Sequence, residues 1–172
     1  MNALGVRLQD GELRLSEPRG EWPVAFQQEA ARLRPFLPRG SELEHIGSTA
    51  VPGLIAKPVL DLAAMLPDPE ALGLLEAVLP EFGYRFHFDG GESRGRIWRK
   101  EPAGLCTHIL HLVEAGEPQW TRWLVLRDLL RQSGEARRQY TEARLSAIDR
   151  TSDRQEYTRL KTATIEHLLD EA

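Results

Sequence analysis

Hydrophobic residues recur at helical intervals near the start of the chain and at strand intervals in its middle. In residues 22–36 the apolar side chains stand three and four positions apart, at Trp22, Phe26, Ala30 and Leu33. This spacing predicts an amphipathic helix. The short segment ELEHI (42–46) predicts a strand. The segment VLDLAAM (59–65) is apolar on both faces, as is typical of a central strand that helices cover on both sides.

The segments between residues 68 and 114 predict a second helix and three more strands. Asp68 followed by Pro69 is a typical helix start, with aspartate as the N-cap and proline at the first helical position. This helix is expected to end near Leu79. The predicted strands are YRFHF (84–88), RGRIWRK (94–100) and THILHLVE (107–114). The turn DGGES (89–93) joins the first two, because Asp-Gly and Gly-Gly sequences allow positive φ.

Two helices are predicted at the end of the chain, over about 118–149 and over 153–170. The first is expected to break near Ser133 and Gly134. The order of the elements indicates an α+β protein, in which helices pack on a mixed sheet and the C-terminal part, residues 118–172, is helical.

The length and composition are those of one globular domain. The chain has 172 residues, of which 41% are hydrophobic and 28% are charged. We therefore expect residues 1–172 to form a single domain, with residues 1–18 as an N-terminal extension. No apolar run approaches the ~20 residues that a membrane helix needs, and no signal peptide is expected. The single cysteine, Cys106, excludes an intramolecular disulfide and fits a cytoplasmic protein.

The formal net charge of −4 makes nucleic acid an unlikely partner, because nucleic-acid-binding proteins usually carry a basic surface. Basic residues nevertheless cluster locally. One cluster contains Arg94, Arg96, Arg99 and Lys100, and the other contains Arg127, Arg131, Arg137, Arg138 and Arg144. Because the planar guanidinium suits phosphate, these clusters are either solvated surface or part of a site for an anionic substrate.

The stretch HIGSTAVPGLIAKPVLDL (45–62) carries the clearest chemical signal. Gly47 allows close approach to the backbone, and the small residue after it leaves N–H groups exposed where a helix starts, which favours phosphate binding. The hydroxyl groups of Ser48 and Thr49 add donors. Asp61 follows within the next predicted strand and offers a hard oxygen ligand for Mg²⁺ or Mn²⁺. The alternatives are a simple tight turn and a structural hydrogen-bond acceptor.

The same stretch resembles the signature of the GrpB family, also called UPF0157, whose members are small proteins with a nucleotidyltransferase-like fold. The resemblance extends from about residue 20 to the end of the chain. It includes GRIWRK, THILHLVE, LVLRDLLR, Tyr140 and the pair Tyr157 and Lys161. It implies a nucleotidyltransferase-like fold, a nucleoside triphosphate as one substrate and a small molecule as acceptor.

One departure from the nucleotidyltransferase pattern concerns the metal. That pattern continues with Asp-x-Asp or Asp-x-Glu on the strand, but Ala63 stands where the second acid is expected after Asp61. Two acids on one strand face can hold two metal ions. A single acid can still bind Mg²⁺ together with substrate phosphates and water.

Two histidines are candidates for the missing ligand. On a strand, His108 and His111 point to opposite faces, so joint chelation is not expected. One of the two is a candidate metal ligand or proton carrier beside Asp61. The alternative for each is a hydrogen-bonded histidine without a role in chemistry.

Further residues are candidate contacts for phosphate or substrate. The family match favours this role for Lys57, which is also a candidate catalytic residue. Arg96, Arg99 and Arg127 are candidates from the basic clusters, although Arg127 could equally form an ion pair with Asp128 on a helix. Tyr157 and Lys161 lie one turn apart on one helix face, which suits either packing or a clamp for the base and phosphate.

These observations predict a Mg²⁺-dependent (or Mn²⁺-dependent) transferase that moves a nucleotidyl or phosphoryl group from a nucleoside triphosphate to a small acceptor. Asp61, His111 and Lys57 are the expected catalytic residues. The absence of a second acid at Ala63 favours an alternative, a binding module that keeps the phosphate cradle without catalysis. A third hypothesis, a histidine-dependent phosphoesterase, conflicts with the strand geometry of the two histidines.

Overall fold

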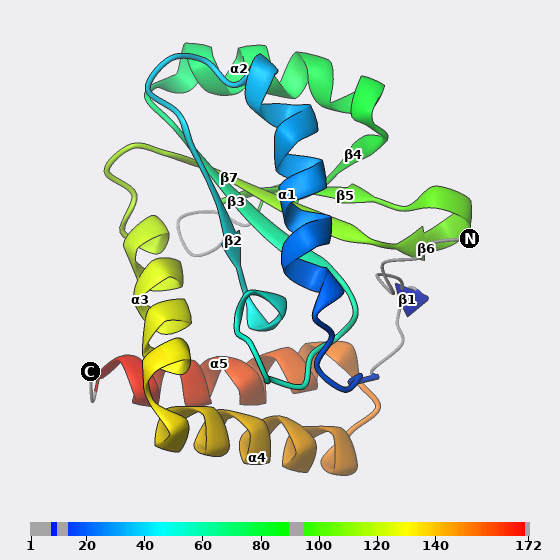
Figure 1. Ribbon diagram of the computed structural model, residues 1–172, viewed down its shortest axis with the longest axis vertical. Helices are drawn as coiled ribbons and strands as arrows, with labels where there is room; N and C mark the ends of the chain where they lie inside the picture. Colours follow the sequence, from blue (N-terminus) through cyan, green and yellow to red (C-terminus); the bar gives the residue numbers. More distant parts are fainter. Residues whose placement is uncertain (1–7, 10–13, 90–94, 171–172) are drawn as a thin grey trace.

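The computed structural model of the chain describes residues 8–9, 14–89 and 95–170 (Figure 1). A five-stranded sheet stands at its centre, with the strand order β2-β3-β7-β5-β4. Its strands are β2 (Glu42–Ile46), β3 (Leu60–Leu66), β4 (Tyr84–Asp89), β5 (Arg96–Lys100) and β7 (His108–Glu114). β3 and β7 run parallel, and the other neighbours are antiparallel. The predicted α+β class with a mixed sheet is therefore confirmed.

Helices cover both faces of the sheet and extend beyond it (Figure 1). The α-helices are α1 (Glu21–Leu33), α2 (Pro69–Val78), α3 (Pro118–Gln132), α4 (Gly134–Arg150) and α5 (Arg154–Asp170). The short 3₁₀ segments are η1 (Arg34–Phe36), η2 (Ser48–Ala50), η3 (Leu79–Phe82) and η5 (Pro102–Gly104). A separate ribbon of two strands, β1 (Leu8–Gln9) and β6 (Leu105–Cys106), lies beside the sheet. The predicted DGGES turn falls largely outside the described residues.

The end of α1 and the start of α2 each have a direct physical cause. α1 gives way to a 3₁₀ turn at Arg34, because Pro35 has no N–H to continue the α-helical ladder. α2 begins as predicted, since the Asp68 carboxylate accepts a hydrogen bond of 2.8 Å from the backbone N–H of Ala71, and Pro69 is the first helical residue.

Strand alternation gives the sheet two different faces. Leu62, Leu110 and Leu112 point to one face and pack with α1 and α2 in the main hydrophobic core. Ala63 and Val113 point to the opposite face and pack against Trp120 of α3. Asp61 and His111 lie on this second face. The face that carries α3 is therefore the one with the predicted catalytic residues of the sheet.

A buried ionic cluster lies on the first face, between α1 and the sheet. Glu29 is 4% exposed and accepts hydrogen bonds from Lys100 at 2.8 and 3.0 Å and from Arg32 at 2.9 Å. Burial disfavours the charged form of Glu29, but the hydrogen bond from Lys100 and the neighbouring positive charges hold its pKa below the ordinary value. His108 packs beside this cluster, with its ring edge-on to Tyr84 and its Nδ1 2.8 Å from the Thr107 hydroxyl. The cluster fixes α1 to β5 and β7.

No helix in the described part of the chain is long and apolar enough to span a membrane.

The partly buried position of His108 predicts a loss of stability in mild acid. Burial lowers its pKa from 6.5 to about 4, against the attraction of Glu29. As the pH falls below 6.5 the unfolded chain binds the proton first, so the stabilisation present above pH 6.5 is lost progressively as the pH approaches 4. The variant His108→Gln removes this titration. In urea unfolding at pH 7.5, 5.5 and 4.5, the wild type should lose roughly 3 kcal/mol more than the variant over this range. Parallel curves for the two proteins would contradict the assignment.

Candidate functional site

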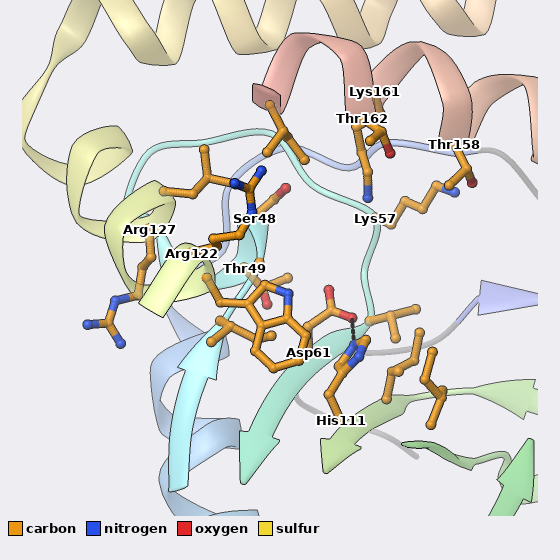
Figure 2. A pocket seen from close by; sticks show the side chains of 18 of the residues that line it. Ser48, Thr49, Lys57, Asp61, His111, Arg122, Arg127, Thr158, Lys161 and Thr162 are labelled. Atoms are coloured by element: carbon orange, nitrogen blue, oxygen red, sulfur yellow. Dashed lines mark ion pairs between the residues drawn. The ribbon is translucent and has the colours of Figure 1, made fainter. Parts of the chain in front are cut away.

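A cavity of about 730 Å³ opens between the second face of the sheet and the C-terminal helices (Figure 2). Its floor includes residues of β2, β3, β4, β5 and β7, and its walls include residues of α3, α4 and α5. The polar or charged lining residues that matter below are Ser48, Thr49, Lys57, Asp61, Arg99, His111, Arg122, Arg127, Tyr140, Arg144, Tyr157, Thr158, Lys161, Thr162 and Glu166. Most of the residues that the sequence marked as candidates therefore meet in one place.

The Gly47–Ser48 turn lies directly against Asp61. β2 and β3 are antiparallel, with Ile46 opposite Asp61, so the turn that follows β2 falls beside the carboxylate. Gly47 has φ 69° and ψ −171°, a conformation that few residues other than glycine adopt. A Cβ atom at this position would stand 2.6 Å from Asp61 Oδ2 and 3.0 Å from Asp61 Cβ. Only a glycine allows the backbone to approach the carboxylate this closely.

Thr49 and His45 support the turn from below. The His45 Nε2 lies 2.9 Å from the Thr49 hydroxyl, and the His45 ring stacks on Phe26 with a centroid distance of 4.8 Å. Burial lowers the pKa of His45 to about 4 and outweighs the attraction of the nearby Asp61 charge. Thr49 lines the cavity, but its hydroxyl is engaged with His45. This contact helps Thr49 to hold the turn.

Three arginines of the C-terminal helices hold the backbone of the segment from residue 45 to residue 55. Arg127 donates to the His45 carbonyl at 3.3 Å, Arg131 donates twice to the Ala50 carbonyl at 2.9 and 3.0 Å, and Arg144 donates to the Ile55 carbonyl at 2.9 Å. A guanidinium suits this task because it carries several N–H donors in a fixed planar arrangement. The second basic cluster of the sequence is thus mainly a support for the turn.

Arg127 forms the ion pair with Asp128 that the sequence offered beside the phosphate contact. Its guanidinium also donates to Glu44 at 2.7 Å and to Asp128 at 2.8 and 3.1 Å, and its side chain is 11% exposed. Figure 2 shows the guanidinium pointing away from Asp61. The residue lines the cavity with its stem, and its charge is neutralised by two carboxylates.

Two tyrosines connect Arg144 to the turn and to Lys57. The Tyr140 hydroxyl lies 3.4 Å from Ser48 Oγ, and the guanidinium of Arg144 stands over the Tyr140 ring at 5.0 Å. Arg144 Nε is 3.3 Å from the Tyr157 hydroxyl, and the Lys57 ammonium lies 4.3 Å above the Tyr157 ring. Tyr157 is buried, and its ring positions Lys57 by a cation–π contact.

A cationic and hydroxyl-bearing wall faces Asp61. Figure 2 shows Thr158, Lys161 and Thr162 of α5 projecting toward the side of the cavity that holds Lys57. Lys161 was expected from the sequence, whereas Thr158 and Thr162 were not. Their spacing around Lys161 on one helix is the signal that could have identified them.

His111 is the histidine that reaches the cavity. Its Nε2 lies 3.8 Å from Asp61 Oδ1, and its ring is 5.0 Å from that of Trp123 on α3. This placement agrees with the strand alternation predicted for the two histidines. His108 faces the opposite side of the sheet and cannot join Asp61 in binding a metal. Trp123 contributes to the cavity wall.

The two arginines of β5 lie on opposite faces of the sheet, as the two histidines of β7 do. Arg99 lies on the cavity face, where it is 5% exposed and pairs with Glu101 at 2.8 Å. Arg96 lies on the other face and pairs with Glu76 of α2 at 2.9 Å, so it does not reach the cavity. Side chains alternate between the two faces of a strand, so residues 96 and 99, three positions apart, point to opposite faces. Arg94 lies outside the described residues.

The donor set fits a metal ion that shares its ligands with a substrate. Asp61 is the hard oxygen donor that the cavity offers, with its side chain 32% exposed, and His111 is the neighbouring nitrogen donor. Among the described residues, no group of three or more His, Cys, Asp or Glu side chains is placed to hold a metal by itself. Mg²⁺ often binds through one carboxylate, substrate phosphates and water, so this set suits Mg²⁺ better than a metal that needs a protein cage.

The close contact at Gly47 yields a test of the site geometry. Gly47→Ala should cost roughly 2 to 5 kcal/mol in urea unfolding, because backbone strain adds to the clash with Asp61. The matched control is Gly53→Ala, in the same segment, with φ 75° and no atom within 4 Å of an added Cβ. The control should cost about 1 to 2 kcal/mol. Equal losses for the two variants would mean that the turn does not pack on the carboxylate.

Comparison with known proteins identifies the family. The sequence model described as "GrpB protein" matches residues 12–171. A UPF0157 protein of Pseudomonas aeruginosa is 34% identical over 156 residues, which are 88% of this chain and 64% of that protein. A UPF0157 protein of Deinococcus radiodurans is 31% identical over 168 residues, 97% of this chain and 86% of that protein. The chain thus spans less than two thirds of the Pseudomonas relative but most of the Deinococcus one.

Solved structures support the same assignment. The crystal structure of the conserved protein GrpB from Enterococcus faecalis aligns with a TM-score of 0.73 and 26% identity, covering 90% of this chain and 98% of that one. The GLD-2/RNP-8 complex aligns with a TM-score of 0.55 and 16% identity, covering 88% and 60%. The Cid1 poly (U) polymerase aligns with a TM-score of 0.52 and 12% identity, covering 76% and 44%. The last two show the nucleotidyltransferase-like fold alone. The chain belongs to the GrpB family, whose fold is that of the nucleotidyltransferases.

Proposed function

We propose that this chain is a Mg²⁺-dependent (or Mn²⁺-dependent) nucleotidyltransferase-like protein that transfers a nucleotidyl or phosphoryl group from a nucleoside triphosphate to a small acceptor. The observation that carries the proposal is the direct packing of the Gly47–Ser48 turn on the Asp61 carboxylate, inside a cavity with Lys57 and Lys161 on its walls. A phosphate seated on the turn would lie beside the one carboxylate suited to its metal.

The charge of the cavity favours a polyanionic ligand. Its cationic lining residues are Lys57, Arg99, Arg122, Arg127, Arg144 and Lys161, whereas Asp61 and Glu166 are the acidic ones among the described residues. Protein carboxylates or carbonyls already engage several of the arginines. Lys161, by contrast, has no acidic side chain within ion-pair distance in the described part of the chain. A triphosphate would supply the missing negative charge.

Each residue has a role that follows from its position. The backbone N–H groups after Gly47 and the Ser48 hydroxyl would bind the phosphates, and Lys57 with Lys161 would stabilise the charge that develops on them. Tyr157 holds Lys57 in place. His111 Nε2 is near enough to Asp61 to orient it, and it is the group best placed to take a proton from an acceptor hydroxyl. A bound Mg²⁺ would neutralise phosphate charge and align the reacting oxygens.

The fold likeness supports the same class of ligand. One of the similar structures is titled as a poly (U) polymerase with MgGTP bound and with selectivity for UTP. The likeness supplies no substrate for this chain, because the identity is 12% and concerns the fold. It makes a nucleoside triphosphate with Mg²⁺ the natural first ligand to test.

The alternative is a module that binds the nucleotide without transferring a group. Ala63, where a second acid would stand, is completely buried beneath the cavity face and packs with Ile46, Val113 and Trp120. Within the described residues, the only other acid that lines the cavity is Glu166, and it is paired with Arg122. A mechanism with two metal ions therefore has no second carboxylate here, which is what favours the binding module.

Binding is tested by thermal unfolding with ATP, GTP, CTP and UTP, each with and without Mg²⁺. At a hundred times the dissociation constant, a ligand should add about 2.7 kcal/mol, or roughly 5 to 10 °C. The shift should require Mg²⁺ and should be lost in Asp61→Asn. Asp149→Asn, an exposed acid of α4 away from the cavity, is the matched control and should keep the shift. If no nucleotide shifts the wild type, the proposed nucleotide site is wrong.

Turnover separates the transferase from the binding module. The protein is incubated with Mg²⁺, a protein-free metabolite extract and a nucleoside triphosphate labelled at the α- or the γ-phosphate. A nucleotidyltransferase moves the α-label to a new product, and a phosphotransferase moves the γ-label. Either transfer should disappear in Asp61→Asn and fall about 100-fold in Lys57→Met. Binding without movement of either label would favour the binding module.

A further inference from the structure

We infer that Arg122 is a phosphate-binding residue of this cavity, and that Glu166 occupies its guanidinium until an anionic ligand displaces the carboxylate. The inference rests on the proposed function in one respect, that the cavity receives a polyanion. It goes further in naming a ligand contact and an intramolecular competitor, neither of which follows from the sequence pattern.

The two residues stand on facing walls of the cavity. Arg122 belongs to the face of α3 that also carries Trp123 and Leu126, and Glu166 belongs to the face of α5 that carries Lys161 and Thr162. Figure 2 shows Arg122 extending from α3 toward α5, on the side of the cavity where Ser48 lies. Its NH2 group donates to a Glu166 carboxylate oxygen. The pair therefore bridges α3 and α5 across the cavity.

The contacts of Arg122 differ from those of the other arginines in the lining. Arg127 and Arg144 each bind backbone carbonyls of the turn segment and have little exposed surface. Arg122 is 40% exposed, and Glu166 is the one hydrogen-bond partner that the structure gives it among the described residues. Since a guanidinium has five N–H donors, most of its capacity is left for a ligand.

The pair is suited to exchange. Glu166 is 50% exposed, and an ion pair between two such exposed side chains contributes little to stability, because water and salt compete with it. A phosphate group offers the same charge and up to three acceptor oxygens, and arginine binds it through two parallel hydrogen bonds. A polyphosphate held at Asp61, Lys57 and Lys161 can therefore replace the Glu166 carboxylate at Arg122. Glu166 thereby lowers the affinity for any ligand too weakly charged to displace it.

The test measures the affinity for inorganic tripolyphosphate by calorimetry at 0.15 M salt. Arg122→Gln should weaken binding by about 10-fold, because a charge-assisted contact is lost. Glu166→Gln should strengthen binding by roughly 2- to 5-fold, because the competitor is removed. Arg122→Lys, which keeps the charge and loses the planar fork, should fall between the wild type and Arg122→Gln.

The control is a matched ion pair on the same helix. Glu156 and Arg159 pair on α5 outside the cavity lining. At 0.15 M salt the Debye length is about 8 Å, so Glu156→Gln and Arg159→Gln should change the affinity by less than about 2-fold. The inference is supported if Arg122→Gln weakens and Glu166→Gln strengthens tripolyphosphate binding while the two control variants leave the affinity nearly unchanged. Weaker binding in both cavity variants would mean that the pair is only a brace between helices, and effects equal to the controls would mean a diffuse charge effect. Either result overturns it.

The same experiment distinguishes this inference from the proposed function. Tripolyphosphate binding with the expected signs but without transfer from any nucleoside triphosphate would keep Arg122 as an anion contact and reject the transferase. A second outcome is transfer that depends on Asp61, together with a tripolyphosphate affinity that Arg122→Gln leaves unchanged. This outcome would keep the transferase and reject the inference. A wild type that binds neither tripolyphosphate nor a nucleotide would reject both.

Discussion

The contact between the arginines of α3 and α4 and the backbone carbonyls of the 45–55 segment determines the geometry of the cavity. This segment contains one proline and two glycines with positive φ, and η2 is its longest regular piece. Its own backbone hydrogen bonds are local ones, from the N–H groups of Ala50, Val51 and Leu54 to carbonyls three positions earlier. Arg127, Arg131 and Arg144 reach it from the helical layer and bind three of its carbonyl groups. These hydrogen bonds to the helices keep the segment in place beside Asp61.

Of these three arginines, Arg144 connects the most parts of the cavity. It is 2% exposed, and it contacts Ile55, Tyr140 and Tyr157. Through the two tyrosines it influences both Ser48 and Lys57, which stand at different points of the cavity. A buried guanidinium without such partners would be strongly unfavourable, so the network must form as a unit. The helical C-terminal part therefore belongs to the site as much as the sheet does.

The fold could be predicted well because it depends on local patterns. The strand at 60–66 is apolar on both faces and lies in the centre of the sheet, and Asp68 with Pro69 begins a helix as expected. The position of Asp61 beside Gly47 follows from pairing of neighbouring strands, so sequence order was a sufficient guide. The assignment of His111 and His108 to opposite faces needed nothing more than the period of a strand.

The roles of the charged residues could not be predicted in the same way. Arg127, Arg131 and Arg144 are bonded to carbonyls more than 80 positions away in the chain, and such contacts depend on how helices pack on the sheet. The role of Arg127 as a phosphate contact stays a prediction, and its bonds to Glu44 and to the His45 carbonyl depend on that packing. Arg96 is different, because the parity that separates it from Arg99 is visible in the sequence, and it was grouped with Arg99 by charge alone. Thr158 and Thr162 carry no charge, so their spacing around Lys161 was the one sequence signal that could have marked them as cavity residues.

The central claim is that the Gly47–Ser48 turn and the Asp61 carboxylate together hold a phosphate and its metal ion. It is tested most directly by anomalous scattering from a crystal of the protein grown with Mn²⁺ and a non-hydrolysable nucleoside triphosphate. The account predicts one Mn²⁺ peak at coordination distance from an Asp61 oxygen, with nucleotide phosphates on the backbone N–H groups that follow Gly47. A Mn²⁺ ion bound away from Asp61, or a nucleotide whose phosphates avoid the turn, would contradict it.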